Sequence, residues 1–502
     1  MKFYNLGNLP AKKDLLSLLP DMLSLHLHTP CGGRGSCGKC RLTVRGAVLP
    51  PSDRERALLS PEELRRGVRL ACLCVTAGGE VEIGIEEAGA ASVQQTGTLP
   101  AFTLSPVTDA PYALAVDIGT TTVALYLCDC RAGRIVFSDG FENPQKRYGA
   151  DVITRISAGM EQPALYAEMK RLLIDALNAS LQSCGADAAQ IGSAVLTGNP
   201  TMLHFLAGLD PRGIAVSPYT PASLFDCALS AEELGLQIAP GAPCFLPPCF
   251  SAYVGADIAT GLVAADCDRE EGVALYLDVG TNGEMGLRTP EGILLCATAT
   301  GPAFEGAHIA CGMSGLPGAI SHIHLLDGKP VCEVIGGGKP IGICGSALID
   351  AGAALLESGV IDDSGYLEED PYPLCEDGSV YLCGRDIREL QLAKAAVRGG
   401  IETLLAESGY AARDIERVYL AGGFGSHILG ASVCRIGMLP PELEPKIRFC
   451  GNTAGMGAVL YALSADARNR IHALPGLCRY LELSGNETFM DAYIEHMAFD
   501  EE

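Results

Sequence analysis

The sequence predicts an α/β protein in two unequal parts, a short cysteine-rich segment followed by a longer α/β region. Three observations carry this prediction. Cysteine and glycine crowd together within the first 87 residues. From Ala113 onward, apolar runs that end in glycine turns alternate with helical stretches. The run VDIGTTT at 116–122 is echoed by LDVGTNG at 277–283, which suggests a duplicated α/β domain.

Composition excludes several classes of protein. The chain has 502 residues, of which 48% are hydrophobic and 19% charged, so it is neither disordered nor confined to one core. A net charge of -24 disfavours binding to nucleic acid or to anionic lipid. No run of 18 apolar residues occurs, and the opening MKFYNLGNLPAKKD lacks a long apolar stretch. We therefore expect a soluble, cytoplasmic protein whose scattered cysteines are reduced thiols.

The predicted boundaries follow the changes in composition. Residues 1–87 form the cysteine-rich domain, and 88–111, poor in charge and rich in Ala, Ser, Thr and Pro, form a linker. The two α/β halves occupy 112–270 and 271–502. Apolar strands are expected at ALAVDIG, SAVLTGN, VALYLDVG and RVYLAGGFG, and helices at 164–181 and 389–407.

Four cysteines form a predicted cluster site. Cys31, Cys37 and Cys40 stand in a glycine-filled loop, C-x₅-C-x₂-C, and Cys72 follows in RLAC. Glycine lets the loop fold around one centre and leaves backbone N–H groups free to point at sulfur. This spacing favours a 2Fe–2S cluster over structural zinc, which usually takes two separated C-x₂-C pairs. Cys74 is an alternative fourth ligand, because on a strand it would face the same side as Cys72.

The two repeated turns combine groups that bind phosphate and metal. Asp117 and Asp278 end apolar strands, where a carboxylate suits Mg²⁺ or a metal-bound water. The glycines and hydroxyl or amide residues that follow let the backbone approach phosphate and supply donors. A single such turn is more often an ordinary hairpin. Two in the same context, followed by the glycine-rich run 421–425, predict a nucleotide site, and GxxxxGK[ST] is absent.

Asp257 lies about twenty residues before the second turn, in YVGADIATG. This position resembles the one where sugar kinases keep a carboxylate, which implies a residue that activates a hydroxyl or orients a water. A helix-capping aspartate is the other reading, and the two weigh about evenly.

Each part resembles a known family. Residues 1–87 resemble the plant and adrenodoxin-type ferredoxins, which implies a β-grasp fold, although the usual opening hairpin is hard to see. Residues 113–460 resemble the actin, sugar-kinase and heat-shock-chaperone ATPases, which implies duplicated actin-like (RNase H-like) domains that close over ATP. Carried onto this chain, the nucleotide-binding positions are Gly119, Thr120, Thr121, Thr122, Gly280, Thr281, Asn282, Gly283, Gly345, Ser346, Gly422, Gly423, Phe424 and Gly425.

Four strings in the longer region are distinctive: NPQKRYGADVITRI, GNPTMLH, GPAFEG and GICGS. With these strings the chain resembles, over nearly its whole length, the reductive activators of corrinoid proteins. The resemblance implies that ATP and Mg²⁺ drive an electron from a 2Fe–2S cluster to Co(II), regenerating Co(I) for methyl transfer. The implied partners are a corrinoid protein of a methyltransferase system and an unidentified electron donor, and a homodimer stays open.

Two other functions remain as alternatives, an electron donor to another low-potential metalloenzyme and a nucleotide-binding redox sensor. Arg147 and Arg155 are candidates for a basic patch that meets the corrinoid partner, with solvated or intramolecular ion pairs as the other reading.

Overall fold

The computed structural model describes residues 2–23, 35, 40–85, 97, 99–280, 282–422 and 428–500. It divides into two compact units: Met1–Ala90 with Pro144–Leu165, and Ala91–Asn143 with Tyr166–Glu502. None of the helices within these described residues is long and apolar enough to cross a membrane.

The first unit contains a four-stranded sheet of order β1-β4-β2-β3. Its core joins buried leucines of α1 to alternate residues of the strands, for example Leu15, Leu42 and Ile83. β1 runs antiparallel to β4, and no hairpin precedes α1 within residues 2–23. The elements are β1 (Lys2–Leu9), α1 (Leu15–Leu23), β2 (Arg41–Val48), α2 (Asp53–Leu58), α3 (Pro61–Arg65), β3 (Val68–Leu70), β4 (Thr76–Ile85), η1 (Pro144–Tyr148) and α4 (Val152–Glu161).

Arg155, on α4, is fully buried, and its Nε donates to the carbonyl of Gly149 at 2.9 Å. The expectation that Arg155 belongs to an exposed basic patch is therefore wrong. Arg147 stacks over the ring of Tyr148, with 4.8 Å between the guanidinium carbon and the ring centroid.

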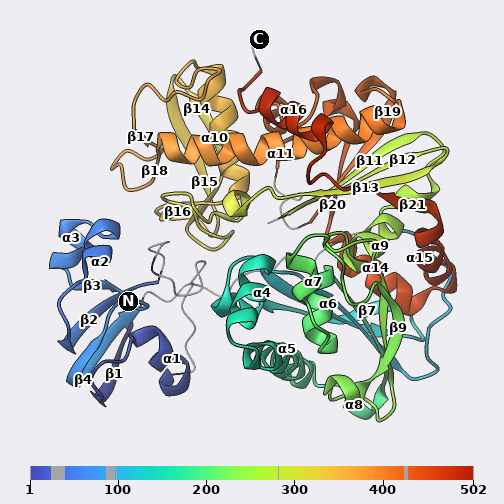
Figure 1. Ribbon diagram of the computed structural model, residues 1–502, viewed down its shortest axis with the longest axis horizontal. Helices are drawn as coiled ribbons and strands as arrows, with labels where there is room; N and C mark the ends of the chain where they lie inside the picture. The colour runs from blue at the N-terminus through green and yellow to red at the C-terminus, as the bar shows by residue number, and fades with distance from the viewer. Residues whose placement is uncertain are drawn as a thin grey trace. The chain divides into compact units, whose positions relative to one another are not determined.

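The second unit repeats one topology in two halves, each with a six-stranded sheet (Figure 1). The first sheet has the order β7-β6-β5-β8-β10-β9 and the second β20-β19-β11-β12-β13-β21. In each, three antiparallel strands are followed by two strands that run parallel to the first of them, β8 and β10 in one sheet and β19 and β20 in the other. The sixth strands differ, because β9 runs antiparallel to β10 and β21 runs parallel to β13. This shared order of strands confirms the duplication that the repeated turns predict.

The first half contains β5 (Tyr112–Ile118), β6 (Thr122–Asp129), β7 (Arg134–Glu142), α5 (Ala164–Ser183), η2 (Ala188–Gln190), β8 (Ile191–Gly198), α6 (Pro200–Ala207), α7 (Arg212–Ala215), β9 (Phe225–Ser230), α8 (Ala231–Leu234), β10 (Pro243–Pro248), α9 (Ala256–Ala264) and η3 (Cys267–Arg269).

The second half contains β11 (Val273–Val279), β12 (Gly283–Thr289), β13 (Gly292–Thr298), η4 (Pro302–Glu305), β14 (Ala319–Leu326), β15 (Lys329–Val334), β16 (Gly342–Ile343), α10 (Gly345–Glu357), β17 (Tyr372–Pro373), β18 (Tyr381–Leu382), α11 (Gly384–Ser408), η5 (Ala412–Asp414), β19 (Ile415–Ala421), α13 (Gly430–Arg435), η6 (Pro441–Lys446), β20 (Ile447–Gly451), α14 (Thr453–Leu463), α15 (Ala465–Leu477), β21 (Cys478–Tyr480) and α16 (Glu487–Glu495).

Helices α9 and α14 lie between the two sheets and share one core with both (Figure 1). They approach so closely that a Cβ on Gly457 of α14 would stand 2.1 Å from the carbonyl oxygen of Thr260 on α9. The two sheets are therefore held together by the closely packed pair α9 and α14. The residues that begin each of these helices lie beside the strand ends.

The described part of the expected linker packs against the second unit. Gly97 bridges to Gly451, and the backbone N–H groups of Ser105 and Val107 donate to carbonyls at the end of α14, both at 2.8 Å. Leu99 and Phe102 pack against the core around α14. Residues 99–111 are thus held on the second unit, because their apolar side chains have a surface to cover.

Candidate functional site

Two of the four predicted cluster ligands lie side by side. Cys40 comes just before β2 and Cys72 in the turn after β3, and their sulfur atoms are 3.3 Å apart without a disulfide. Cys31 and Cys37 lie outside the described residues.

Cys74 points elsewhere. Residues 71–73 form a turn, so the strand geometry that would put Cys72 and Cys74 on one side is absent. Cys74 is fully buried in the core of the sheet, and burial raises the pKa of its thiol to about 12. Cys74 is thus part of the apolar core of this sheet.

Four carboxylates converge at the ends of the central strands of the second unit. Asp117 ends β5, Asp278 ends β11, Asp257 lies in the first turn of α9, and Glu284 faces Asp278 across the β11–β12 hairpin. Burial raises the pKa of Asp117 to about 6. Burial, and then the charge of Asp117, raises the pKa of Asp278 to about 7.

For the other two carboxylates, Asp257 and Glu284, two neighbouring charges add to the effect of burial on the pKa. Burial and the charges of Asp278 and Asp117 raise the pKa of Asp257 to about 8. Burial and the charges of Asp257 and Asp278 raise the pKa of Glu284 well above its usual range. Mutual repulsion of this kind is typical of a site built to receive a cation or a proton.

The geometry does not form a ready-made metal cage. Within the described parts of the chain, no three His, Cys, Asp or Glu side chains stand close enough together to hold a metal ion. Mg²⁺ commonly keeps several waters and is bound through one or two carboxylates plus phosphate oxygens. The donor set therefore fits a hydrated Mg²⁺ that arrives with a nucleotide.

Asp257 is not the N-cap residue of α9. Gly255 is the N-cap, and the Asp257 Oδ1 accepts from the N–H of Ile258 in the first turn, at 3.0 Å. A Cβ on Gly255 would lie 2.6 Å from that same oxygen, so the glycine leaves room for the carboxylate.

The first hairpin, from β5 to β6, is tied to both halves of the unit. The Thr120 hydroxyl accepts a hydrogen bond from the Asn199 amide at 2.9 Å, and the Thr121 hydroxyl donates to Glu305 Oε2 at 2.7 Å. The carbonyl of Gly119 accepts from the Asn143 amide at 2.8 Å. Thr122 opens β6 and is exposed.

The second hairpin repeats the arrangement. Gly280 donates its N–H to the carbonyl of Asn282 at 2.8 Å, and its own carbonyl accepts from Thr300 at 2.9 Å. Gly283 begins β12, and Thr281 lies outside the described residues.

Of the glycine-rich run, Gly422 is described and Gly423, Phe424 and Gly425 lie outside the described residues. Gly422 has a φ of +84°, and a Cβ there would stand 2.5 Å from Asp278 Oδ1. Glycine is therefore needed at this position for the strand end to pass the carboxylate.

Gly345 and Ser346 begin α10. The Ser346 hydroxyl donates to the carbonyl of Ser321 on β14 at 2.8 Å, and both α10 residues are buried. In this structure the hydroxyl thus braces α10 against its neighbouring sheet.

Sequence analysis missed the roles of Glu284 and Asn452. The Asn452 amide donates to Asp117 Oδ2 at 2.9 Å and to the Tyr126 hydroxyl at 3.3 Å, while its oxygen caps α14 at the N–H of Gly455, at 2.7 Å. The available signal for Glu284 was hairpin register, since a tight turn after Asp278 places it directly opposite. For Asn452 the only signal was an asparagine before a helix.

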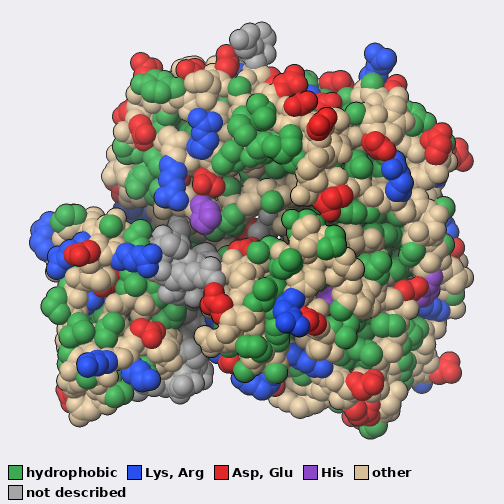
Figure 2. Space-filling model, in the orientation of Figure 1, with side chains coloured by type: hydrophobic (Ala, Val, Ile, Leu, Met, Phe, Trp, Pro, Cys, Tyr) green, Lys and Arg blue, Asp and Glu red, His purple; other side chains and the backbone are tan. Residues whose placement is uncertain are grey.

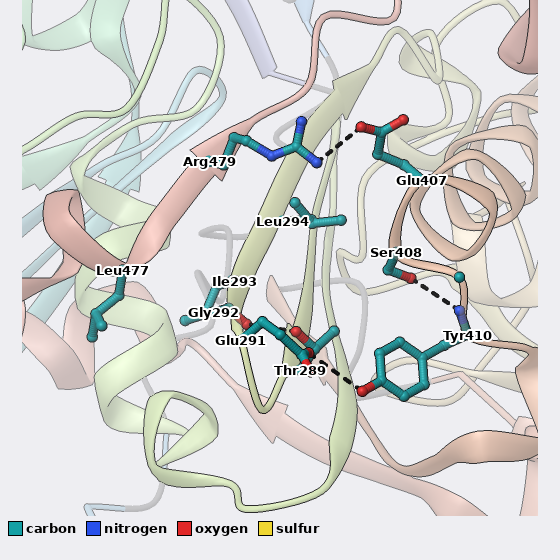
Figure 3. Close-up of a pocket in the computed structure, with 11 residues that line it drawn as sticks. Thr289, Glu291, Gly292, Ile293, Leu294, Glu407, Ser408, Tyr410, Leu477 and Arg479 are labelled. Carbon is teal, nitrogen blue, oxygen red and sulfur yellow. Dashed lines mark hydrogen bonds and ion pairs between the residues drawn. The ribbon is translucent and has the colours of Figure 1, made fainter.

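A pocket of about 480 Å³ is lined by residues other than the four carboxylates and Asn452 (Figure 3). It lies between the turn that joins β12 to β13, the end of α11 and β21. Arg479 and Glu407 form an ion pair there at 2.9 Å, and the Tyr410 hydroxyl donates to Glu291 at 3.3 Å. The polar groups of the pocket thus largely satisfy one another.

Comparison with known proteins covers almost the whole chain. Family models match residues 8–77 as a 2Fe–2S iron–sulfur cluster binding domain, 112–270 as the RACo middle region, and 272–502 as the C-terminal domain of RACo, the ASKHA domain.

Three similar proteins agree with these matches. The corrinoid activation enzyme RamQ of Eubacterium limosum is 31% identical over 77% of this chain and 70% of its own. A Co(II) methylated amine-specific corrinoid protein reductase of Methanosarcina barkeri is 24% identical over 77% of each chain. The solved structure of a reductive activator for corrinoid, iron–sulfur protein superposes with a TM-score of 0.71 at 26% identity, covering 98% of this chain and 96% of that one.

Proposed function

Because the chain belongs to the RACo family of corrinoid activation enzymes, we propose that it uses ATP to drive an electron from a 2Fe–2S cluster to the Co(II) of a corrinoid protein. The product is Co(I), the form that accepts a methyl group. The observation that carries the proposal is the presence in one chain of a cysteine pair in a ferredoxin domain and a carboxylate cluster between duplicated ATPase halves.

The cysteine pair fits one edge of a cluster. Two thiolates on one tetrahedral centre lie about 3.8 Å apart when each metal–sulfur bond is near 2.3 Å. The sulfur atoms of Cys40 and Cys72, 3.3 Å apart, are close to that spacing. A 2Fe–2S cluster supplies a one-electron carrier, and in this proposal Cys31, Cys37, Cys40 and Cys72 hold it.

The carboxylates fit the other half of the reaction. Asp117 and Asp278, from opposite halves of the unit, would hold the hydrated Mg²⁺ of ATP, and the glycine turns that follow them would leave room for phosphate. Asp257, in the first turn of α9, orients the attacking water and takes its proton. Asn452 keeps the Asp117 carboxylate pointing into the site.

Energetics explain why ATP is required. Plant-type clusters have reduction potentials of about -400 mV, and we expect the Co(II)/Co(I) couple of a bound corrinoid to have a lower potential. Each 100 mV uphill costs one electron about 2.3 kcal/mol. ATP-dependent closure of the two halves supplies this energy if it changes the affinity for the Co(II) and Co(I) forms of the partner.

The test follows Co(I) directly. Dithionite-reduced protein is mixed with a corrinoid protein in the Co(II) state, and the visible spectrum is recorded with ATP, without nucleotide, and with a non-hydrolysable analogue. We expect catalytic Co(I) formation only with ATP. Complete reduction without nucleotide would reject the coupling, and no Co(I) under any condition, with an intact cluster and ATPase, would point to another metalloenzyme as acceptor.

A further inference from the structure

The ferredoxin domain has an arginine-rich surface. Between residues 41 and 69 the sequence contains seven arginines, no lysine and four acidic residues. Six of the arginines are exposed, whereas Arg69 is buried and forms a bidentate ion pair with Glu55 at 2.8 and 2.9 Å. We call the exposed set the arginine face: Arg41 and Arg45 on β2, Arg54 and Arg56 on α2, and Arg65 and Arg66 at the end of α3.

Two contacts of Arg41, a hydrogen bond and an ion pair, connect β2 with α2 and α3. Arg41 donates to the carbonyl of Leu58 at the end of α2, at 3.5 Å, and pairs with Glu63 on α3 at 3.2 Å. Blue side chains gather over α2 and α3 in Figure 2.

The arginine face adjoins the cysteine pair. Arg41 follows Cys40 directly, and in the sheet it pairs with Leu70, two residues before Cys72. A protein that docks on β2, α2 and α3 is therefore brought close to the two described ligands.

The charge of this domain is opposite to that of the rest of the chain. Residues 1–87 contain 12 basic and 10 acidic residues, and residues 88–502 contain 24 basic and 50 acidic residues. An acidic protein is repelled by the larger part of the chain and attracted only to the ferredoxin domain.

We propose that the arginine face is the docking site of an acidic electron-carrier protein that reduces the cluster. This inference rests on the proposed function for one point, that electrons enter at the cluster. The donor needs to meet only the ferredoxin domain. The corrinoid protein must also respond to the nucleotide state of the strongly acidic ATPase halves, so an acidic carrier fits the donor role better.

The electron balance is simple with a flavodoxin as the carrier. Its anionic flavin hydroquinone loses one electron and becomes the neutral semiquinone, and the oxidised cluster gains that electron. No proton moves and no further reactant is needed.

The experiment measures cluster reduction by a reduced acidic flavodoxin in a stopped-flow instrument, from low to high salt. We expect the second-order rate constant to fall steeply with salt, because steering by opposite charges is screened. Arg54→Glu with Arg56→Glu should lower the rate constant at low salt by about 10-fold or more. Arg54→Gln with Arg56→Gln should lower it less. The dissociation constant for the two oxidised proteins, measured at low salt, should rise in the same order.

Lys12→Glu with Lys13→Glu is the matched control. These two residues are exposed in the same domain, outside the arginine face, and the change in net charge is identical. The control should keep nearly the wild-type rate constant, and both variants should be fully reduced by dithionite. Equal loss in the two variants, or no salt dependence, would overturn the proposal. Neither result would change the expected ATP-dependent Co(I) formation from dithionite-reduced protein, so the proposed function is tested separately.

Discussion

Asn452 connects two functions in one side chain, because it caps α14 through its oxygen and holds Asp117 through its nitrogen. We predict that Asn452→Ala lowers ATP turnover by about 10-fold or more, since a misplaced metal-binding carboxylate loses transition-state stabilisation. Asn486→Ala is the control, because Asn486 caps α16 in the same way, at the N–H of Phe489. Both variants should lose about 1 kcal/mol of stability. Equal ATPase activity in the two would show that capping is the whole role of Asn452.

Cys72 and Cys74 are two positions apart in the sequence but lie in different surroundings. We predict that Cys72→Ser loses the cluster and that Cys74→Ser retains it, because the Cys72 sulfur lies beside that of Cys40 and Cys74 is fully buried. Anaerobic iron and sulfide assay, with EPR after dithionite, measures the outcome. About two irons per chain are expected in the wild type and in Cys74→Ser. The opposite result would move the fourth ligand to Cys74.

Asp257 makes the nucleotide-free protein sensitive to pH. Its pKa in the fold is about 8, against 3.8 for the ordinary carboxyl, so folding favours the protonated form. The corresponding stability is complete below about pH 4 and is lost as the pH rises through about 8. Asp257→Asn cannot ionise, and we predict a melting temperature above that of the wild type by about 2 °C or more at pH 9, with a smaller difference at pH 6. Calorimetry without Mg²⁺ or nucleotide measures both, and parallel pH curves would contradict the prediction.

At the scale of elements, the crossing of α9 and α14 determines how the two sheets are held. Gly457→Ala would place a methyl group 2.1 Å from the Thr260 carbonyl oxygen, so the helices must separate. We predict a loss of about 1–3 kcal/mol and a lower melting temperature, with lower ATPase activity. Gly476→Ala on α15 is the control, because a Cβ there meets nothing within 4 Å. Similar melting temperatures in the two variants would mean that the crossing adapts.

The strands could be predicted because a short apolar run that ends in a glycine turn is typical of a buried strand. The expected ALAVDIG strand at 113–119 is β5 at Tyr112–Ile118, and the predicted helix at 164–181 is α5 at Ala164–Ser183. Arg155 was misjudged because a charged residue is rarely fully buried, and only the folded chain shows the Gly149 carbonyl that it contacts. Asn452 and Asp117 are 335 residues apart, and nothing local in the sequence brings them together.

For the whole molecule, the central question is whether ATP hydrolysis and electron transfer depend on each other. Asp278 lies at the end of β11, far along the chain from the cysteines, and belongs to the other compact unit. We predict that Asp278→Ala lowers ATP turnover by about 10²-fold or more, as loss of a group that positions metal and water often does. The cluster should keep its visible and EPR spectra, because none of its proposed ligands is changed.

The same variant separates coupling from simple electron donation. If ATP supplies the energy of an uphill step, Asp278→Ala with a fully reduced cluster should form little Co(I), even with ATP in excess. Cys72→Ser provides the complementary case, with ATPase activity retained and no Co(I) formed. A variant that hydrolyses ATP normally would show that Asp278 has no part in the nucleotide site. Normal Co(I) formation by a variant that cannot hydrolyse ATP would show that binding of the partner, rather than hydrolysis, overcomes the difference in potential.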